Sequence, residues 1–171
     1  MRFRPTAIEG LTIIELERHF DGRGGFCRTF CEAEFEDAGI PFRVVQANLS
    51  TNPHTHTLRG MHYQQAPFGE PKVVQCLKGR IFDVAVDMRS DSPTYLHWES
   101  FELAAEFSRM VHIGVGLAHG FLTLEPDSEV LYLMGAPYEP NAAHGFRWDD
   151  PSIGIHWPPA PKMISQRDAN Y

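Results

Sequence analysis

The sequence lacks long apolar runs and contains few cysteines. No segment approaches the roughly 20 consecutive apolar residues of a membrane-spanning helix, and the first residues lack the apolar core of a signal peptide. Cysteine occurs three times, at Cys27, Cys31 and Cys76, which is an odd number without the spacing of a metal site. We therefore expect reduced thiols and a cytoplasmic protein.

A surplus of positive charge is also missing. The chain carries 15 basic and 22 acidic residues, which gives a formal net charge of −7. Nucleic-acid binding needs a basic surface, so this balance argues against a nucleic-acid partner. The missing apolar runs argue against a membrane partner. A small anionic ligand stays compatible, because a few cations in one cleft can outweigh a distant acidic surface.

Helical patterns are scarce as well. Only Glu32–Ala38 has a helical pattern, with Gly39 in a position to end it, and a second short helix is expected after Ser165. Most of the chain consists instead of short β-type runs separated by turn residues. The expected strands are Leu11–Leu16, Gly25–Phe30, Arg43–Leu49, Leu58–Tyr63, Lys72–Leu77, Arg80–Asp87, Trp98–Leu103, Arg109–Ile113, Ala118–Thr123 and Glu129–Met134.

This pattern favours an all-β sandwich or jelly roll. Lys78 and Gly79 separate two of the runs and predict a hairpin turn, and further turns are expected at Ser92–Thr94 and Glu125–Asp127. The 171 residues contain no linker and no repeat, so we expect a single domain over residues 1–171.

One expected strand carries chemically active side chains. Strict alternation places Arg59 on one face of this strand and His62 on the other, beside Leu58 and Gly60. A histidine in that position is either a satisfied core residue or a working group in a cavity. The strand alone leaves both readings open. If Arg59 and His62 contact one ligand, the strand must twist or bulge near Gly60, or the ligand must reach round it.

Three further residues are candidates for chemistry. Lys72 opens an apolar strand, where it is either a solvated charge or a desolvated cation facing a developing oxyanion. His119 follows the glycine-rich stretch 114–116, and Tyr132 is either an ordinary barrel residue or a phenolic acid facing a cavity.

A metal site is poorly supported by the histidines. The spacing of Gly116 and His119 is similar to the second half of the cupin signature, but the first half is incomplete. His54 and His56 form an H-x-H pair without a glutamate at the required distance, since Glu70 lies too far along. A full set of metal ligands is therefore missing, and a solvated loop is the preferred reading of His54 and His56.

Taken together, these segments resemble the dTDP-4-dehydrorhamnose 3,5-epimerase family of cupin-fold sugar-nucleotide enzymes. The resemblance runs from Asp21 to Asp168, nearly the whole chain. Its markers are Asp21–Phe26, Gln46–Ser50, Leu58–Gln64, Lys72–Val74, Asp83–Arg89, Ser92–Thr94, Ala118–Phe121, Tyr132, Trp148–Pro151 and Ser165–Asp168. The resemblance implies an all-β fold, namely a cupin-type double-stranded β-helix or jelly roll with one or two short helices.

The resemblance also implies a reaction. Family members act on a nucleotide-linked 4-keto-6-deoxy-hexose in deoxysugar biosynthesis and invert carbons on either side of the ketone. The ketone acidifies the neighbouring C–H bonds, so a base can remove a proton, and returning a proton to the opposite face inverts the centre. This chemistry needs a base, an oxyanion stabiliser and an acid.

By resemblance, four residues carry this chemistry. His62 is the base, and Asp168 is the carboxylate that orients its imidazole. Lys72 faces the C4 oxygen, and Tyr132 is the acid that delivers a proton to the other face. No metal and no other cofactor is required.

The resemblance assigns a second set of residues to substrate binding. Arginines match cations that contact the nucleotide sugar and its diphosphate, Tyr138 matches an aromatic that stacks on the base, and Asp83 is assigned to support His119 or the sugar hydroxyls. A homodimer formed by strand exchange at the N-terminal edge is also implied. The substrate-binding residues are Arg23, Gln46, Asn48, Arg59, His119, Tyr138 and Arg167, with Arg28 as an added anion contact.

Two positions depart from the family pattern. Arg28 and Ala143 stand where the family usually has glutamates, and both missing carboxylates belong to the substrate-binding set. Ordinary drift explains this, or a changed substrate does: another nucleobase, or another sugar such as a dideoxy-hexose or a heptose. The sequence also leaves open whether one or two carbons are epimerised.

Two other functions compete with the epimerase. A metal-dependent cupin oxygenase or isomerase is disfavoured by the missing ligand glutamate, and elemental analysis of purified protein would decide this point. A non-catalytic sugar-nucleotide binding protein on the same fold predicts loss of His62, Tyr132 or Asp168, and all three are present.

Overall fold

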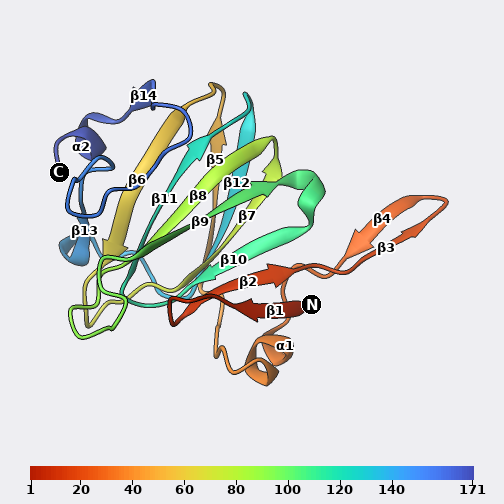
Figure 1. Cartoon of the computed structure of the whole chain (residues 1–171). Coiled ribbons are helices and arrows are strands. Elements are labelled where there is room, and N and C mark those ends of the chain that lie inside the picture. The colour runs from red at the N-terminus through yellow and green to blue at the C-terminus, as the bar shows by residue number, and fades with distance from the viewer.

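Two β-sheets packed face to face form the body of the molecule in the computed structural model, which describes residues 1–171 (Figure 1). The first sheet has the order β1–β2–β10–β7–β12–β5 and the second β13–β6–β11–β8–β9, with β14 pairing parallel to β6. A separate two-stranded hairpin, β3–β4, projects from one side (Figure 1). The predicted all-β jelly roll with short helices is confirmed.

The element bounds follow the chain in order. The strands of the first half are β1 (Arg2–Pro5), β2 (Leu11–Glu15), β3 (Arg18–Asp21), β4 (Gly24–Cys27), β5 (Gln46–Asn52), β6 (Thr57–Gln64), β7 (Lys72–Lys78) and β8 (Arg80–Asp87). Those of the second half are β9 (Trp98–Ala104), β10 (Arg109–Ile113), β11 (Leu117–Thr123), β12 (Ser128–Met134), β13 (Ala143–Gly145) and β14 (Met163–Ile164). The helices are α1 (Glu32–Asp37) and α2 (Gln166–Ala169), with two 3-10 turns, η1 (Ala105–Phe107) and η2 (Pro140–Ala142).

The main core lies between the two sheets. Alternate residues of each strand point inward, such as Val74 and Cys76 from β7 against Ile81 and Ala85 from β8. Burying one valine, leucine or isoleucine side chain contributes about 1.5–3 kcal/mol. This core holds the sheets together away from the pocket described below.

Smaller apolar clusters cover the outer faces of the sheets. Phe35 of α1 is fully buried against the first sheet, with Phe30 and Phe42 beside it. The irregular C-terminal segment covers the second sheet with side chains that include Trp157, whose Nε1 donates a hydrogen bond to the Trp148 carbonyl at 2.9 Å. None of the helices combines the length and apolar character needed to span a membrane.

All ten expected strands overlap observed ones, but the predicted hairpin at Lys78 and Gly79 is wrong. Strands β7 and β8 belong to different sheets, so this turn carries the chain from one layer of the sandwich to the other. Gly79 has a positive φ of 71°, which suits a tight turn whether or not the two flanking strands pair with each other. Inward residues of β7 and β8 pack into the same core, so the two strands have similar sequence patterns although they do not pair with each other.

Candidate active site

A cavity of about 780 Å³ opens between the two sheets, and the C-terminal segment closes one wall. Its size falls within the range of small-molecule sites. Strands of both sheets contribute to the lining: β5, β7 and β12 from the first, and β6, β11, β13 and β14 from the second. Ten of the twelve predicted site residues line it, namely Gln46, Asn48, Arg59, His62, Lys72, His119, Tyr132, Tyr138, Arg167 and Asp168.

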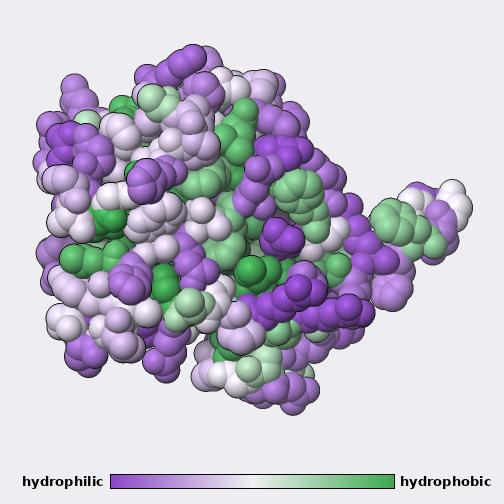
Figure 2. Space-filling model, viewed as in Figure 1, coloured by the Kyte–Doolittle hydropathy of each residue, from purple (hydrophilic) through white to green (hydrophobic).

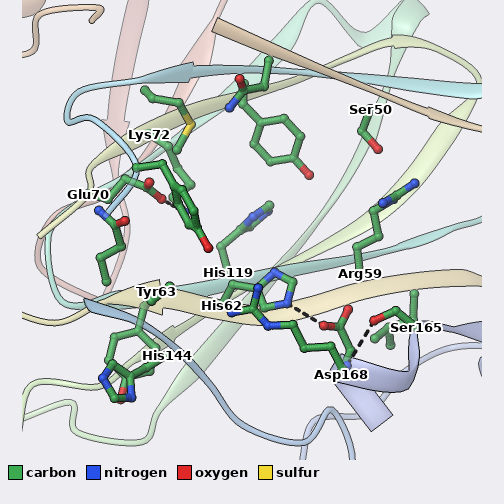
Figure 3. Close-up of a pocket in the computed structure, with 18 of the residues that line it drawn as sticks. Ser50, Arg59, His62, Tyr63, Glu70, Lys72, His119, His144, Ser165 and Asp168 are labelled. Carbon is green, nitrogen blue, oxygen red and sulfur yellow. Dashed lines mark hydrogen bonds and ion pairs between the residues drawn. The ribbon is translucent and has the colours of Figure 1, made fainter. Parts of the chain in front are cut away.

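His62 and Asp168 form a hydrogen-bonded pair in this cavity. Nε2 of His62 lies 2.8 Å from Oδ1 of Asp168, and the carboxylate is buried while the imidazole is 41% exposed (Figure 3). Ser165 caps α2 by accepting a hydrogen bond from the Asp168 amide at 3.1 Å, which fixes the position of the carboxylate. Burial lowers the pKa of His62, and the hydrogen bond and charge of Asp168 oppose this shift. The imidazole is thus oriented and neutral near pH 7, as a general base requires.

An irregularity in β6 brings Arg59 into the same cavity as His62. His62 pairs with His119 of β11 and Arg59 with Phe121, so β6 has two residues between these pairs where β11 has one. Such a bulge shifts the alternation by one residue, and both side chains then line the cavity. The expectation of opposite faces from strict alternation is therefore wrong. Arg59 Nε donates to Oδ1 of Asn52 at 2.7 Å, which holds its guanidinium.

The bulge depends on Gly60. Its φ is +127°, and a Cβ there would lie 2.6 Å from the Cα of Gly120. The Gly60 amide donates to Oδ2 of Asp168 at 3.2 Å. The carboxylate that orients the imidazole is thereby tied to the bulge itself.

Lys72 is a buried cation with one carboxylate partner. Its Nζ lies 2.8 Å from Oε1 of Glu70, and both side chains are less than a tenth exposed. The structure supports the interpretation of Lys72 as a desolvated cation in a cavity and not as a solvated residue at a strand end.

Tyr132 stands beside a second histidine–carboxylate pair. The ring of His119 lies edge-on at 5.8 Å from the Tyr132 ring, and His119 Nε2 lies 2.7 Å from Oδ2 of the fully buried Asp83. Burial, reinforced by the charge of Asp83, raises the pKa of Tyr132. The phenol therefore keeps its proton at neutral pH and can act as an acid.

The remaining predicted residues line the walls around these groups. Gln46 Nε2 donates to Oδ1 of Asn48 at 3.1 Å along β5. Arg167 Nε donates to the Tyr171 hydroxyl at 2.8 Å, and Tyr138 is half exposed at the rim. These polar groups face the cavity as contacts for a polar ligand.

Arg23 and Arg28 do not reach this cavity. Arg23 lies in the turn of the β3–β4 hairpin, where its 91% exposed side chain pairs with Asp21 at 2.7 Å. Arg28 pairs with Glu34 of α1 at 2.6 Å and is 61% exposed. Neither arginine is among the residues that line the cavity of the single chain.

The sequence reading missed several residues that line the cavity. Ser50 continues the period-two pattern of Gln46 and Asn48, so alternation could have found it. His144 is brought in by β13, a strand too short to leave a pattern. The residues missed are Ser50, Tyr63, Glu70, His144 and Ser165, all labelled in Figure 3.

The donor groups do not gather as metal ligands. No three histidine, cysteine, aspartate or glutamate side chains lie close enough together to hold a metal ion. The cavity instead combines an oriented imidazole, a buried ammonium and a protonated phenol. Fold and site together define a cupin-type enzyme suited to moving protons on a polar, anionic substrate.

Comparison with known proteins narrows this class to one family. The family model of dTDP-4-dehydrorhamnose 3,5-epimerase matches residues 5–171. A dTDP-4-dehydrorhamnose 3,5-epimerase of Methanothermobacter thermautotrophicus is 42% identical, over 99% of this chain and 92% of its own. The chain belongs to the dTDP-4-dehydrorhamnose 3,5-epimerase family.

Solved structures agree with this membership. An epimerase of Legionella pneumophila in complex with dTDP-4-keto-L-rhamnose is 36% identical with a TM-score of 0.92, covering 98% of this chain and 89% of that one. ChmJ, a 3'-monoepimerase of Streptomyces bikiniensis in complex with dTDP-quinovose, is 37% identical with a TM-score of 0.90, covering 96% and 83%.

Proposed function

We propose that the protein epimerises a nucleotide-linked 4-keto-6-deoxy-hexose, of the dTDP-4-dehydro-6-deoxyglucose type, at C3 and C5. The observation that carries this proposal is the placement of acid and base in the cavity. His62 stands on β6 of the second sheet and Tyr132 on β12 of the first, so a sugar ring between them meets a base on one face and an acid on the other. Inversion at carbon needs this arrangement.

The first step is removal of a proton beside the ketone. Neutral His62 takes the proton, and the Asp168 carboxylate 2.8 Å away stabilises the imidazolium that forms. The electron pair of the broken C–H bond moves onto the C4 oxygen as an enolate. The buried Lys72 ammonium faces that oxygen and stabilises its negative charge.

The second step returns a proton to the opposite face of the same carbon. Tyr132 supplies it, because its phenol carries a proton at neutral pH. The enolate collapses to the ketone, and the centre is inverted. Proton exchange with solvent then returns His62 to its neutral form and Tyr132 to its protonated form, and repetition at the second carbon completes a double epimerisation.

The nucleotide end of the substrate needs cations and aromatic surface. Arg59 and Arg167 lie in the cavity lining and suit diphosphate oxygens, and the half-exposed Tyr138 suits stacking on the nucleobase. Ala143 also lines the cavity, which leaves its wall without the carboxylate that the family pattern places there. This supports a nucleobase or sugar contact that differs from the family pattern.

A homodimer would complete the site. The β3–β4 hairpin stands clear of the body, and Figure 2 shows hydrophobic surface in green on this projection. Two of its side chains, Phe20 and Phe26, are 74% and 75% exposed. Strand β5 is the last strand of its sheet, with one edge unpaired, and its side chains line the cavity. An exposed apolar hairpin and an open edge on the same chain suit exchange between two copies. The exchanged hairpin would carry Arg23 toward the partner's cavity.

Incubation with a panel of 4-keto-6-deoxy nucleotide sugars in deuterated water tests the proposal. Proton NMR is expected to show solvent deuterium at both C3 and C5 for at least one nucleotide. Absence of exchange at either carbon with every nucleotide would contradict it.

A single epimerisation at C3 is the second candidate. It is favoured by the similarity to ChmJ, a 3'-monoepimerase at 37% identity. Deuterium at C3 alone, at every time point, would select this candidate.

A further inference from the structure

The cavity wall contains a buried ion pair of which only one member has a place in the proton-transfer scheme. The Lys72 ammonium lies 2.8 Å from Oε1 of Glu70, and the two side chains are 6% and 9% exposed. Each is the other's only side-chain hydrogen-bond partner. Removing two charges from water is costly, and a buried pair is often no more stabilising than packed apolar groups. Structural stabilisation alone therefore explains this pair poorly.

The backbone holds the Glu70 carboxylate in place. Glu70 precedes Pro71, whose carbonyl accepts a hydrogen bond from the Gly135 amide at 2.7 Å. A Cβ on Gly135 would lie 2.7 Å from the Pro71 ring, so the two segments are in close contact. Lys72 follows as the first residue of β7, and Figure 3 shows Glu70 and Lys72 together on one wall of the cavity.

We infer that Glu70 is a positioning residue that holds the Lys72 ammonium aimed at the ketone oxygen; this inference rests on the proposed function. An ammonium has three N–H donors, and Glu70 accepts from one of them. Two donors are left for the substrate, one of them for the C4 oxygen.

Turnover of Glu70→Gln tests the positioning role. This variant keeps the size and a hydrogen-bond acceptor but removes the charge. We expect kcat to fall about tenfold, because the oxyanion stabiliser is weakened rather than removed, while KM stays within about threefold. Glu70→Asp should restore part of the rate. As a control, Glu102→Gln removes one exposed partner of Arg80 far from the cavity and should change neither constant.

A second readout does not depend on turnover. The chain has only three lysines, so lysine labelled with ¹⁵N gives few ammonium signals, and Lys72→Arg assigns one of them. In the wild type, the Lys72 signal is expected to exchange slowly with water, and in Glu70→Gln it should be lost or displaced. An unchanged signal, or an unchanged kcat, in Glu70→Gln would overturn the inference. Failure of the wild type on every nucleotide sugar would instead overturn the proposed function, and the ammonium signal would then decide whether Glu70 holds Lys72.

Discussion

Asp168 acts on two parts of the site through its two carboxylate oxygens. Oδ1 accepts from the His62 imidazole, and Oδ2 accepts from the Gly60 amide in the bulge. The base and the backbone irregularity that presents it are therefore fixed by one side chain. Sequence spacing alone could not reveal this, because more than 100 residues separate Asp168 from both partners.

The pH dependence of activity follows from His62. The imidazole must be unprotonated to accept a proton, so kcat/KM should fall as the pH drops through its pKa, which burial holds below the ordinary value of about 6.5. Asp168→Asn removes the negative charge, and with it the charge assistance of the hydrogen bond, that oppose the effect of burial. In this variant the acid limb of the profile should move to lower pH, and the plateau rate should fall about 100-fold or more. An acid limb that stays in place would contradict the pairing.

Substitution of Tyr132 is expected to slow inversion at carbon much more than exchange of the substrate hydrogen with solvent. Tyr132→Phe keeps the ring beside His119 but removes the proton that returns to the opposite face. The variant should still exchange the substrate C–H with deuterated water, while inversion falls by about 100-fold. NMR that follows deuterium content and product configuration in one sample measures both rates. Equal losses of exchange and inversion would assign Tyr132 a different role.

The bulge of β6 is the element on which the site depends. Gly60→Ala forces a side chain into a backbone with φ of +127° and into contact with Gly120, so the free energy of unfolding should fall by about 3 kcal/mol or more. Epimerase activity should be lost as well, because Arg59 and His62 would leave their common wall. Urea denaturation and turnover measure the two effects.

Gly154→Ala is the matched control for Gly60→Ala. Its φ is also positive, at +66°, but a Cβ there meets nothing within 4 Å. The cost should be about 1 kcal/mol, and activity should be unchanged. Similar losses in the two variants would show that backbone strain alone, rather than the bulge, explains the result.

The strands were predicted best where apolar and polar residues alternate regularly along the sequence. The runs Arg80–Asp87 and Arg109–Ile113 match their strands at both ends, since each has inward residues in the core between the sheets. Strands β13 and β14, of three and two residues, are too short to show a period. In β6, the bulge shifts the alternation of side chains, so a strict period of two gave the wrong faces. The turn after β7 joins strands of different sheets, and local sequence does not encode which strands pair.

At the scale of the whole molecule, we expect the proposed homodimer to complete the candidate site. The resemblance identified Arg23 as a substrate contact, yet the residue stands on the projecting hairpin with its side chain 91% exposed. Family motifs supply residue identities without saying which chain delivers them. Most of the cavity could thus be predicted from sequence, and the position of Arg23 outside it could not.

The hairpin can be tested through its exposed aromatics. Replacing Phe20 and Phe26 by serine removes the apolar surface expected to bind the partner. Sedimentation should then show a monomer for this variant and a dimer for the wild type. Turnover should fall with it, because the cavity would lose Arg23. Tyr95→Ser, which alters another exposed aromatic at 43% exposure, should leave the dimer intact. A wild type that is monomeric at working concentration would contradict the exchange of the β3–β4 hairpin between two copies of the chain.

The exchange of one substrate hydrogen with solvent shows whether His62 is the base. Wild type and His62→Ala are compared in deuterated water with the nucleotide sugar that the wild type turns over, and calorimetry follows binding of its nucleoside diphosphate. Removal of the general base should slow exchange by at least about 100-fold while the dissociation constant stays within about threefold. Exchange that continues at the wild-type rate in His62→Ala would contradict the account and reassign the base.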